Sequence, residues 1–384
     1  MLPPPLAPMK TIFRITIVAL CTAVLLVLLG EAYLRWHYFG LPTGEKHRPH
    51  PYLQTVLRRD VPFIDGEALT EEGFRRTGPD HTGENVRRVL VVGDSCAFSI
   101  SSSSEAQSFP TLLEAGLNRS FEGAFEVYNA GVPGYGSLQM LLWLAQVFDE
   151  VDPDEVVIYG GWNDFRILMH DRGMLYIENN CLGMPRMYRH REYWELRDRD
   201  AGAFQRFLRK LYLYDMLSFR LETHYVKKRI RAFRRNHALS EMPPEPLLID
   251  EVFANFETNL ENMIALSRGR GAEVSLVTLG TPLRRRYTPA QERTVRERFD
   301  RDFLRLAPAE MARYAFAFSD IARTLGKRYG CTVYDWERWY HEAGDDDASM
   351  FVDLVHPSDE GYAFLVDGVL AQLLSRAGTR TPAP

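Results

Sequence analysis

Short runs rich in β-branched residues alternate with segments of helical periodicity, and this alternation restricts the possible folds more than any other feature of the sequence. The expected strands cover residues 87–93, 125–129, 155–161, 272–280 and 331–337. The expected helices cover residues 108–118, 137–149, 249–268, 309–328 and 358–376. Strands that alternate with helices form β-α-β units, which build a parallel sheet with helices on both faces. The sequence therefore predicts an α/β fold with a central parallel sheet of about five strands.

One segment interrupts the alternation, because residues 165–248 are far too long for a loop between two strands. Within it, residues 201–235 carry apolar side chains at roughly helical spacing, with ten Lys or Arg against two acidic residues. The sequence predicts a helical insertion at about 165–248. Two interpretations of its basic character stay open: a helical cap with a solvated face, or a lid that binds an anionic lipid or polymer.

The N-terminal segment has the composition of a membrane helix. Lys10 and Arg14 precede an uncharged run over residues 15–30, which approaches the length that a bilayer requires. A cleaved signal peptide is the alternative, but no small-x-small cleavage site follows the run. We expect a cytoplasmic tail and a single transmembrane anchor over residues 1–35, with the large domain on the extracytoplasmic, periplasmic side.

The overall composition of the chain is that of an ordinary globular protein. The chain has 384 residues, of which 46% are hydrophobic and 25% charged, and its net charge is -5, which does not indicate a nucleic-acid partner. Residues 36–86 are rich in Pro, Gly, His and charge without a sustained period, which predicts a linker and an irregular lead-in. The folded domain is then expected over residues 87–378.

Metal, cofactor and disulfide chemistry find little support in the sequence. The ten histidines form no HExxH motif and the four cysteines form no CxxC motif, so we expect no metal and no cofactor. The cysteines are too few for a disulfide framework, and Cys21 lies in the expected membrane helix. The sequence leaves open whether Cys181 and Cys331 pair.

Four short polar motifs follow the expected strands or precede the last helix. Ser95 lies in VVGDSCAF just past the first strand, and Asn163 lies in YGGWND at the end of the third. NAGVPGYGS, at residues 129–137, is a glycine-rich turn that leads into a helix. Asp353 and His356 lie in DLVHPSDEGY before the last helix. Ligands bind at the carboxyl ends of the strands in an open parallel sheet, so the three motifs at strand ends are expected at one edge.

Each motif alone has an ordinary structural explanation, such as a helix cap or an Asx turn. Together they supply what a serine nucleophile needs, namely a base that takes the hydroxyl proton and a carboxylate that orients the base. Asp353 and His356, three residues apart, are close enough to form that pair. Cys96 is a competing nucleophile, but adjacent side chains that leave a strand point in different directions, so only one of Ser95 and Cys96 can face His356. We expect Cys96 to pack beneath the loop.

In this combination and order, the motifs resemble the four blocks of the SGNH hydrolases, also called the GDSL esterase and lipase superfamily. The resemblance implies a flavodoxin-like three-layer α/β/α sandwich. It implies that Ser95 is the nucleophile, His356 the base and Asp353 the residue that orients the base. It also implies an oxyanion hole formed by the backbone amides of Ser95 and Gly134 and the side-chain amide of Asn163.

The resemblance covers roughly residues 87–376, apart from the insertion. The sequence departs from it after the serine, where CAFSISSSSEAQSF stands in place of a Thr-Phe-Gly-like run, so substrate contacts of this loop are not carried over. The Gly-x-Ser-x-Gly motif of the α/β-hydrolases is absent, because Ala97 occupies its last position.

The function implied is that of a membrane-tethered serine esterase without a cofactor. Its expected substrate is an ester, either an O-acyl or O-acetyl group on a cell-envelope glycan or a lipid ester. One alternative is an O-acyltransferase that uses the same triad to move an acyl group to a sugar hydroxyl. Another is a non-catalytic envelope scaffold or binding module. The expected partners are this ester substrate and the membrane, with no nucleic acid.

Overall fold

The computed structural model describes residues 7–39, 47–50, 53–57, 69–70, 73–75, 85–164, 208, 214, 249–299, 308–343 and 348–379. The chain divides into two compact units. The first unit comprises Met1–Glu45 and Met184–His237, and the second unit comprises Lys46–Gly183 and Ala238–Pro384. The insertion expected at about 165–248, with its basic helices, lies outside the described residues apart from Leu208 and Tyr214.

The second unit is built on a parallel sheet of five strands in the order β4-β3-β5-β6-β7. The strands are β3 (Val86–Gly93), β4 (Ala124–Gly131), β5 (Glu155–Tyr159), β6 (Glu273–Val277) and β7 (Thr332–Tyr334). The centre of β3 is buried on both sides, because Val89, Leu90, Val91 and Val92 are all at most 2% exposed. A continuous apolar run of this kind is typical of a strand that helices cover on both faces. The prediction of a central parallel sheet with about five strands is confirmed.

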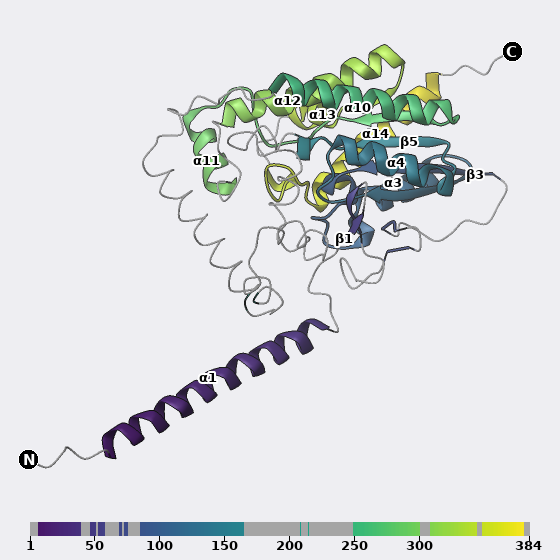
Figure 1. The fold of residues 1–384 in the computed structure, drawn as a ribbon. Helices are drawn as coiled ribbons and strands as arrows, with labels where there is room; N and C mark the ends of the chain where they lie inside the picture. Colours follow the sequence, from purple (N-terminus) through teal and green to yellow (C-terminus); the bar gives the residue numbers. More distant parts are fainter. Residues whose placement is uncertain are drawn as a thin grey trace, which may run out of the picture. The chain divides into compact units, whose positions relative to one another are not determined.

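Helices cover both faces of this sheet, which gives the three-layer α/β/α arrangement (Figure 1). α3 and α14 pack against each other on one face, and α4 and α12 both pack against α10 on the other. The helices of this unit are α2 (Ser95–Phe98), α3 (Phe109–Ser120), α4 (Ser137–Val151), α10 (Ile249–Gly269), α11 (Pro289–Phe299), α12 (Pro308–Tyr329), α13 (Trp336–Glu342) and α14 (Asp359–Thr379). Short 3-10 turns lie at η1 (Glu105–Gln107) and η3 (Ala348–Met350).

The last three strands are shorter than the sequence predicts, because their carboxyl ends leave the sheet to form loops. β5 ends at Tyr159, and Gly161 then adopts a φ of 136°, which an L side chain rarely permits. β7 ends at Tyr334, and the next turn begins α13, whose residues had been expected to continue the strand. Hydrophobic patterning identifies the strands but not the residue at which each one turns away from the sheet.

The lead-in before β3 contains structure that the sequence does not predict. β1 (His47–His50) and β2 (Gln54–Leu57) form an antiparallel hairpin. Leu53 and Phe74 are buried in the hydrophobic core. The Phe74 ring meets the Trp143 ring of α4 edge-on, with 6.4 Å between the ring centroids, and the Tyr128 ring of β4 edge-on at 6.1 Å. Two strands of four residues are too short for a clear periodic signal, which is why this segment resembles a linker in sequence.

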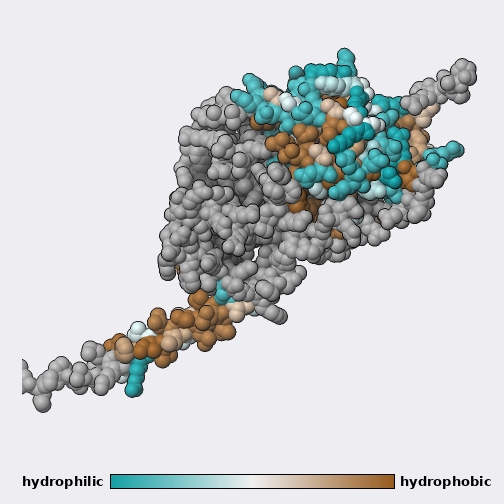
Figure 2. All heavy atoms as spheres, turned by 45° about the vertical axis from the view of Figure 1, so that its right-hand side comes forward, coloured by the Kyte–Doolittle hydropathy of each residue, from teal (hydrophilic) through white to brown (hydrophobic). Residues whose placement is uncertain are grey.

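The first unit contributes one long helix, α1 (Ala7–Phe39), which extends past the expected anchor boundary at residue 35. Its stretch Thr11–Tyr33 is long and apolar enough to cross a membrane, and it is the one described segment with this property. Figure 2 shows its surface as almost continuously hydrophobic. A signal sequence near an N-terminus is the other kind of segment that meets the same criteria of length and hydropathy.

Candidate active site

Ser95 lies in the turn that follows β3, the strand from which the sheet extends in both directions. In sheets of this order, ligands bind beyond the carboxyl ends of the strands at this switch point. Gly93 is required there, because a Cβ atom at this position would lie 1.8 Å from the carbonyl oxygen of Tyr159. Ser95 is the first residue of α2, so the helix itself offers its amide no acceptor.

The loop before α14 carries Asp353 and His356 and is folded around the Asp353 carboxylate. Asp353 Oδ1 accepts hydrogen bonds from the backbone amides of Val355 and His356, both at 2.7 Å. The hydroxyl of Thr281, which follows β6, donates to the carbonyl of Leu354 at 2.9 Å. These bonds fasten the loop to the same edge of the sheet at which Ser95 lies.

The structure brings Ser95, His356 and Asp353 into one hydrogen-bonded chain. Ser95 Oγ lies 2.8 Å from His356 Nε2, and His356 Nδ1 lies 2.7 Å from Asp353 Oδ2. Burial by itself raises the pKa of Asp353, but hydrogen bonds and the charge of His356 outweigh burial and lower that pKa below its usual value. Asp353 therefore stays ionised, as a carboxylate that orients an imidazole must. The His356 side chain is 22% exposed, which leaves the chain of groups open to a substrate.

Cys96 points away from this arrangement. Its side chain is 0% exposed, and Sγ lies 3.4 Å from the carbonyl oxygen of Val355. Burial raises the pKa of the Cys96 thiol well above its usual value, so the thiol stays protonated and is a poor nucleophile. Cys331 carries a free thiol, and Cys181 lies outside the described residues.

The turn after β4 holds Gly134 in a conformation that favours glycine. The amide of Tyr135 donates to the carbonyl of Val132 at 3.1 Å, and Gly134 between them has a φ of 92°. Proline followed by a residue of positive φ is the pattern of a type II turn, which leaves the Gly134 amide outside the turn's own hydrogen bond. The amide of Val132 bonds to the carbonyl of Gly93 at 3.0 Å, which joins this turn to the end of β3.

Asn163 lies in the loop after β5 and faces the same turn. Its Nδ2 donates to the carbonyl of Tyr135 at 2.9 Å. A side-chain amide carries two hydrogens, so this bond orients the group and leaves the second hydrogen for another acceptor. All the expected residues of the oxyanion hole thus lie in the loops that follow β3, β4 and β5.

Two buried carboxylates hold these loops together, and the sequence motifs alone predict no role for them. Asp94 Oδ2 accepts from the amides of Gly161 and Trp162 at 3.3 and 3.2 Å, which links the Ser95 turn to the loop of Asn163. Asp164 accepts from both the amide and the hydroxyl of Ser137, at 2.8 and 2.7 Å. Their position beside Ser95 and Asn163 in GDS and WND is the signal that could have identified them.

The serine-rich loop after α2 uses its hydroxyls within the fold. Ser101 Oγ donates to the carbonyl of Pro357 at 2.6 Å, and the amide of Ser103 donates to Asp359 Oδ1 at 2.9 Å. Ser108 caps α3 by accepting from the amide of Thr111 at 3.4 Å. The loop that departs from the family pattern thereby connects the Ser95 segment to the His356 segment.

No group of three or more His, Cys, Asp and Glu side chains suited to a metal ion occurs within the part of the chain that the structure describes. A hydroxyl, an imidazole and a carboxylate in sequence can perform nucleophilic attack, and the nearby amides can stabilise a developing negative charge.

The model of the GDSL-like lipase/acylhydrolase family matches residues 91–364 of this chain. A search of curated proteins found no match. The solved structure of TesA is 18% identical, with a TM-score of 0.42, and the match covers 75% of this chain and 98% of that one.

Two other solved structures are similar to the same extent. A lipase/acylhydrolase from Enterococcus faecalis is 17% identical, with a TM-score of 0.41 and coverage of 76% of this chain and 96% of that one. The psychrotrophic esterase EstA from Pseudoalteromonas sp. is 13% identical, with a TM-score of 0.40 and coverage of 76% and 100%.

Proposed function

Because this chain belongs to the GDSL-like lipase/acylhydrolase family and is an ester-hydrolysing enzyme, we propose that it cleaves its substrate through an acyl-enzyme on Ser95. The observation that carries the proposal is the continuous hydrogen-bonded chain from Ser95 through His356 to Asp353, at 2.8 and 2.7 Å. In this proposal Ser95 is the nucleophile, His356 the general base and Asp353 the group that orients His356.

The first half of the reaction forms the acyl-enzyme. Ser95 Oγ attacks the ester carbonyl carbon while His356 Nε2 takes the hydroxyl proton. The carbonyl oxygen becomes an oxyanion in the tetrahedral intermediate. When the intermediate collapses, the carbon–oxygen bond to the alcohol breaks and His356 returns the proton to the leaving alkoxide, which departs as the alcohol. Asp353 remains ionised and stabilises the imidazolium in between.

We propose that the oxyanion is bound by the backbone amides of Ser95 and Gly134 and by the Nδ2 of Asn163. The Tyr135 carbonyl that holds Asn163 and the left-handed conformation of Gly134 support this assignment, because both fix a donor before substrate arrives. One such donor contributes on the order of 3 kcal/mol to stabilisation of the transition state in comparable acyl-transfer sites.

The second half of the reaction returns the enzyme to its starting state. Water attacks the acyl carbon while His356 takes a proton from the water molecule. His356 then returns this proton to Ser95 Oγ, and the carboxylic acid departs. The proposed substrate is an O-acyl or O-acetyl ester on a cell-envelope glycan, or a lipid ester. The apolar stretch Thr11–Tyr33 supports a membrane-anchored enzyme whose catalytic unit acts at the envelope.

Ester hydrolysis by the full chain in detergent tests the proposal. We expect the wild type to hydrolyse aryl esters and to be labelled by a fluorophosphonate. Ser95→Ala should abolish the label, and Ser95→Ala and His356→Ala should each lower kcat by at least about 10³-fold. Ser375→Ala, which removes an exposed serine hydroxyl on α14, is the matched control and should leave both readouts unchanged.

The outcome also separates the alternatives. A wild type that is not labelled, or a label that persists in Ser95→Ala, would contradict the serine nucleophile and favour a non-catalytic scaffold. Labelling with ester cleavage only in the presence of a glycan acceptor would favour an O-acyltransferase. A series of aryl esters from acetyl to long acyl chains distinguishes the substrates, because a fall after acetyl favours glycan deacetylation and a rise favours lipids.

A further inference from the structure

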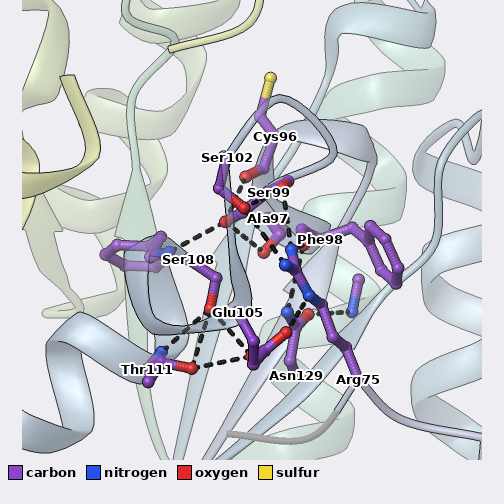
Figure 3. A network of polar contacts seen from close by, with 12 residues as sticks. Arg75, Cys96, Ala97, Phe98, Ser99, Ser102, Glu105, Ser108, Thr111 and Asn129 are labelled. Carbon is purple, nitrogen blue, oxygen red and sulfur yellow. Dashed lines mark hydrogen bonds and ion pairs between the residues drawn. The ribbon is translucent and has the colours of Figure 1, made fainter. Parts of the chain in front are cut away.

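A buried arginine from the lead-in segment lies beneath the helix that carries Ser95. Arg75 is 5% exposed, and it reaches the core from the segment before β3 (Figure 3). Its backbone amide donates to the carbonyl of Asn129 at 3.2 Å, in an antiparallel bridge with β4 at the edge of the sheet. The lead-in is thereby attached to the strand next to β3.

The Arg75 guanidinium binds the carboxyl end of α2. Nη1 donates to the carbonyls of both Phe98 and Ser99 at 2.8 Å, and Nη2 donates to Ser102 Oγ at 3.2 Å. The last carbonyls of a helix have no partner within the helix, so they need an external donor when they are buried. A guanidinium supplies several donors in one fixed plane, which suits two adjacent carbonyls.

Glu105 completes the network and balances the buried charge. The Nε of Arg75 forms an ion pair with the Glu105 carboxylate. The other carboxylate oxygen accepts from the hydroxyls of Thr111 and Ser108, at 2.8 and 3.1 Å.

Removal of the arginine would leave the half-buried Glu105 carboxylate without its counter-charge. The Phe98 carbonyl would keep only the weaker bond from Asn129 Nδ2 at 3.3 Å, and the Ser99 carbonyl would keep its bond from the Ser102 hydroxyl at 2.9 Å. The end of α2 would therefore lose the group that joins the two carbonyls.

The network fixes α2 in a conformation that the local sequence does not favour. α2 has four residues, and the residue that ends it, Ser99, adopts φ 61° and ψ 50° without being a glycine. A left-handed residue of this kind costs on the order of 1 kcal/mol and persists only where its surroundings enforce it. Asp94 holds the start of α2, and Arg75 holds its end.

We propose that Arg75 is a positioning residue for catalysis, which acts by fixing the turn of helix that carries Ser95. The inference rests on the proposed role of Ser95 as the nucleophile. Ser95 and Phe98 belong to the same helical turn, so a shift of the Phe98 carbonyl moves Ser95 relative to His356. The segment between the apolar N-terminal helix and the sheet is therefore part of the catalytic unit.

Variants of the full chain in detergent test the inference. The probes are a small fluorophosphonate, whose second-order rate constant of labelling reports the reactivity of Ser95, and an aryl acetate, which gives kcat and KM. We expect Arg75→Met to lower kcat and the labelling rate constant by about 10- to 100-fold, because misplacement of a reacting group by about 1 Å has effects of that size. KM should stay unchanged, because the position of the nucleophile affects the free energy of the transition state and not the binding of the substrate in its ground state.

Two further variants separate positioning from loss of stability. Arg75→Lys keeps the charge but cannot bind both carbonyls and Glu105 in one plane, so we expect an intermediate kcat. Arg323→Met removes a partly buried arginine whose partners are Asp320, Asp335 and Glu337, and it should reduce the thermal unfolding temperature without lowering kcat.

Two outcomes would overturn the inference and leave the proposed function standing. One is a wild-type kcat in folded Arg75→Met, and the other is an equal loss of kcat in Arg75→Met and Arg323→Met. If Arg75→Met does not fold, Arg75→Lys decides: a lowered kcat at unchanged KM supports positioning, and a wild-type kcat refutes it. A wild-type chain without labelling or hydrolysis would instead refute the proposed function itself.

Discussion

At the scale of single residues, the structure separates two neighbours that the sequence presents as competitors. Ser95 is half-buried and lies against His356, whereas Cys96 is fully buried and lies against the carbonyl of Val355. The difference arises because both residues begin a helical turn, in which successive side chains point about 100° apart. Burial then keeps the thiol of Cys96 protonated.

We expect Cys96→Ala to keep a kcat within about threefold of the wild type, because the thiol takes no part in the reaction and loses one weak hydrogen bond. The cavity that it leaves should lower the free energy of unfolding by about 1 kcal/mol. Hydrolysis of an aryl acetate and thermal unfolding measure the two effects. Loss of the fluorophosphonate label in Cys96→Ala, with Ser95 intact and the protein folded, would contradict this assignment.

At the scale of elements, the site depends on bonds between loops that follow different strands. Asp164, after β5, binds both the amide and the hydroxyl of Ser137 at the start of α4, and Asn259 of α10 donates to that same hydroxyl at 2.9 Å. This pairing holds the loop of Asn163 against the turn of Gly134. Burial raises the pKa of Asp164 to about 6, so its protonation state changes near neutral pH.

We expect Asp164→Asn to remove a pH dependence of stability. A carboxyl whose pKa is raised in the folded state stabilises the fold when protonated, so its contribution is complete below pH about 4 and is lost as pH rises through about 6. The unfolding temperature of the wild type relative to Asp164→Asn should therefore fall between pH 4 and pH 7. Thermal unfolding of both proteins across this range measures the difference.

The same variant should lower kcat about fivefold at pH 8, because the amide and the hydroxyl of Ser137 bind different oxygens of Asp164 and asparagine replaces one of these acceptors by an NH2 donor, which removes a hydrogen bond worth about 1 kcal/mol. Ser375→Ala serves again as the control for both readouts. Parallel pH profiles for the wild type and Asp164→Asn would show that another group is responsible for the titration.

At the scale of the whole molecule, the strand order determines where the candidate site lies. The order β4-β3-β5-β6-β7 brings the ends of β3, β4 and β5 together at one switch point, although Ser95 and His356 are 261 residues apart. The lead-in contributes Arg75 and a hairpin to the same unit. The apolar stretch Thr11–Tyr33 precedes that unit in the chain.

We expect the mature protein to retain Thr11–Tyr33 and to stay in the membrane fraction after a high-salt and alkaline wash, because about 20 apolar residues in a helix match the hydrocarbon core. Intact mass and fractionation of the natively expressed chain measure this. A chain that starts at residue 41 is the control and should be recovered in the soluble fraction. A mature N-terminus located after Tyr33 would show that the segment is a cleaved signal instead.

The sequence by itself determined the fold class and was sufficient to propose the site residues. Alternation of short apolar runs with helical periods is a local property, so five strands and their main helices could be located without coordinates. Ser95 and Asn163 were proposed because their motifs follow strand ends, and Asp353 and His356 because their motif precedes the last helix and matches the fourth block of the resemblance. The glycine-rich turn expected over residues 129–137 is also present, and the structure adds that Pro133 and Gly134 form the centre of a type II turn.

Only the tertiary structure decided which of these groups touch and what holds them in place. The bonds of Arg75 to α2, of Asp94 to the loop after β5 and of Asp164 to α4 join segments far apart in the chain. No local pattern specifies such partners, because long-range contacts arise from packing of the whole core. The role of the lead-in is not visible in the sequence for this reason. It resembles a linker, and only the packing of the core shows that it supplies the buried Arg75 beneath the helix that carries Ser95.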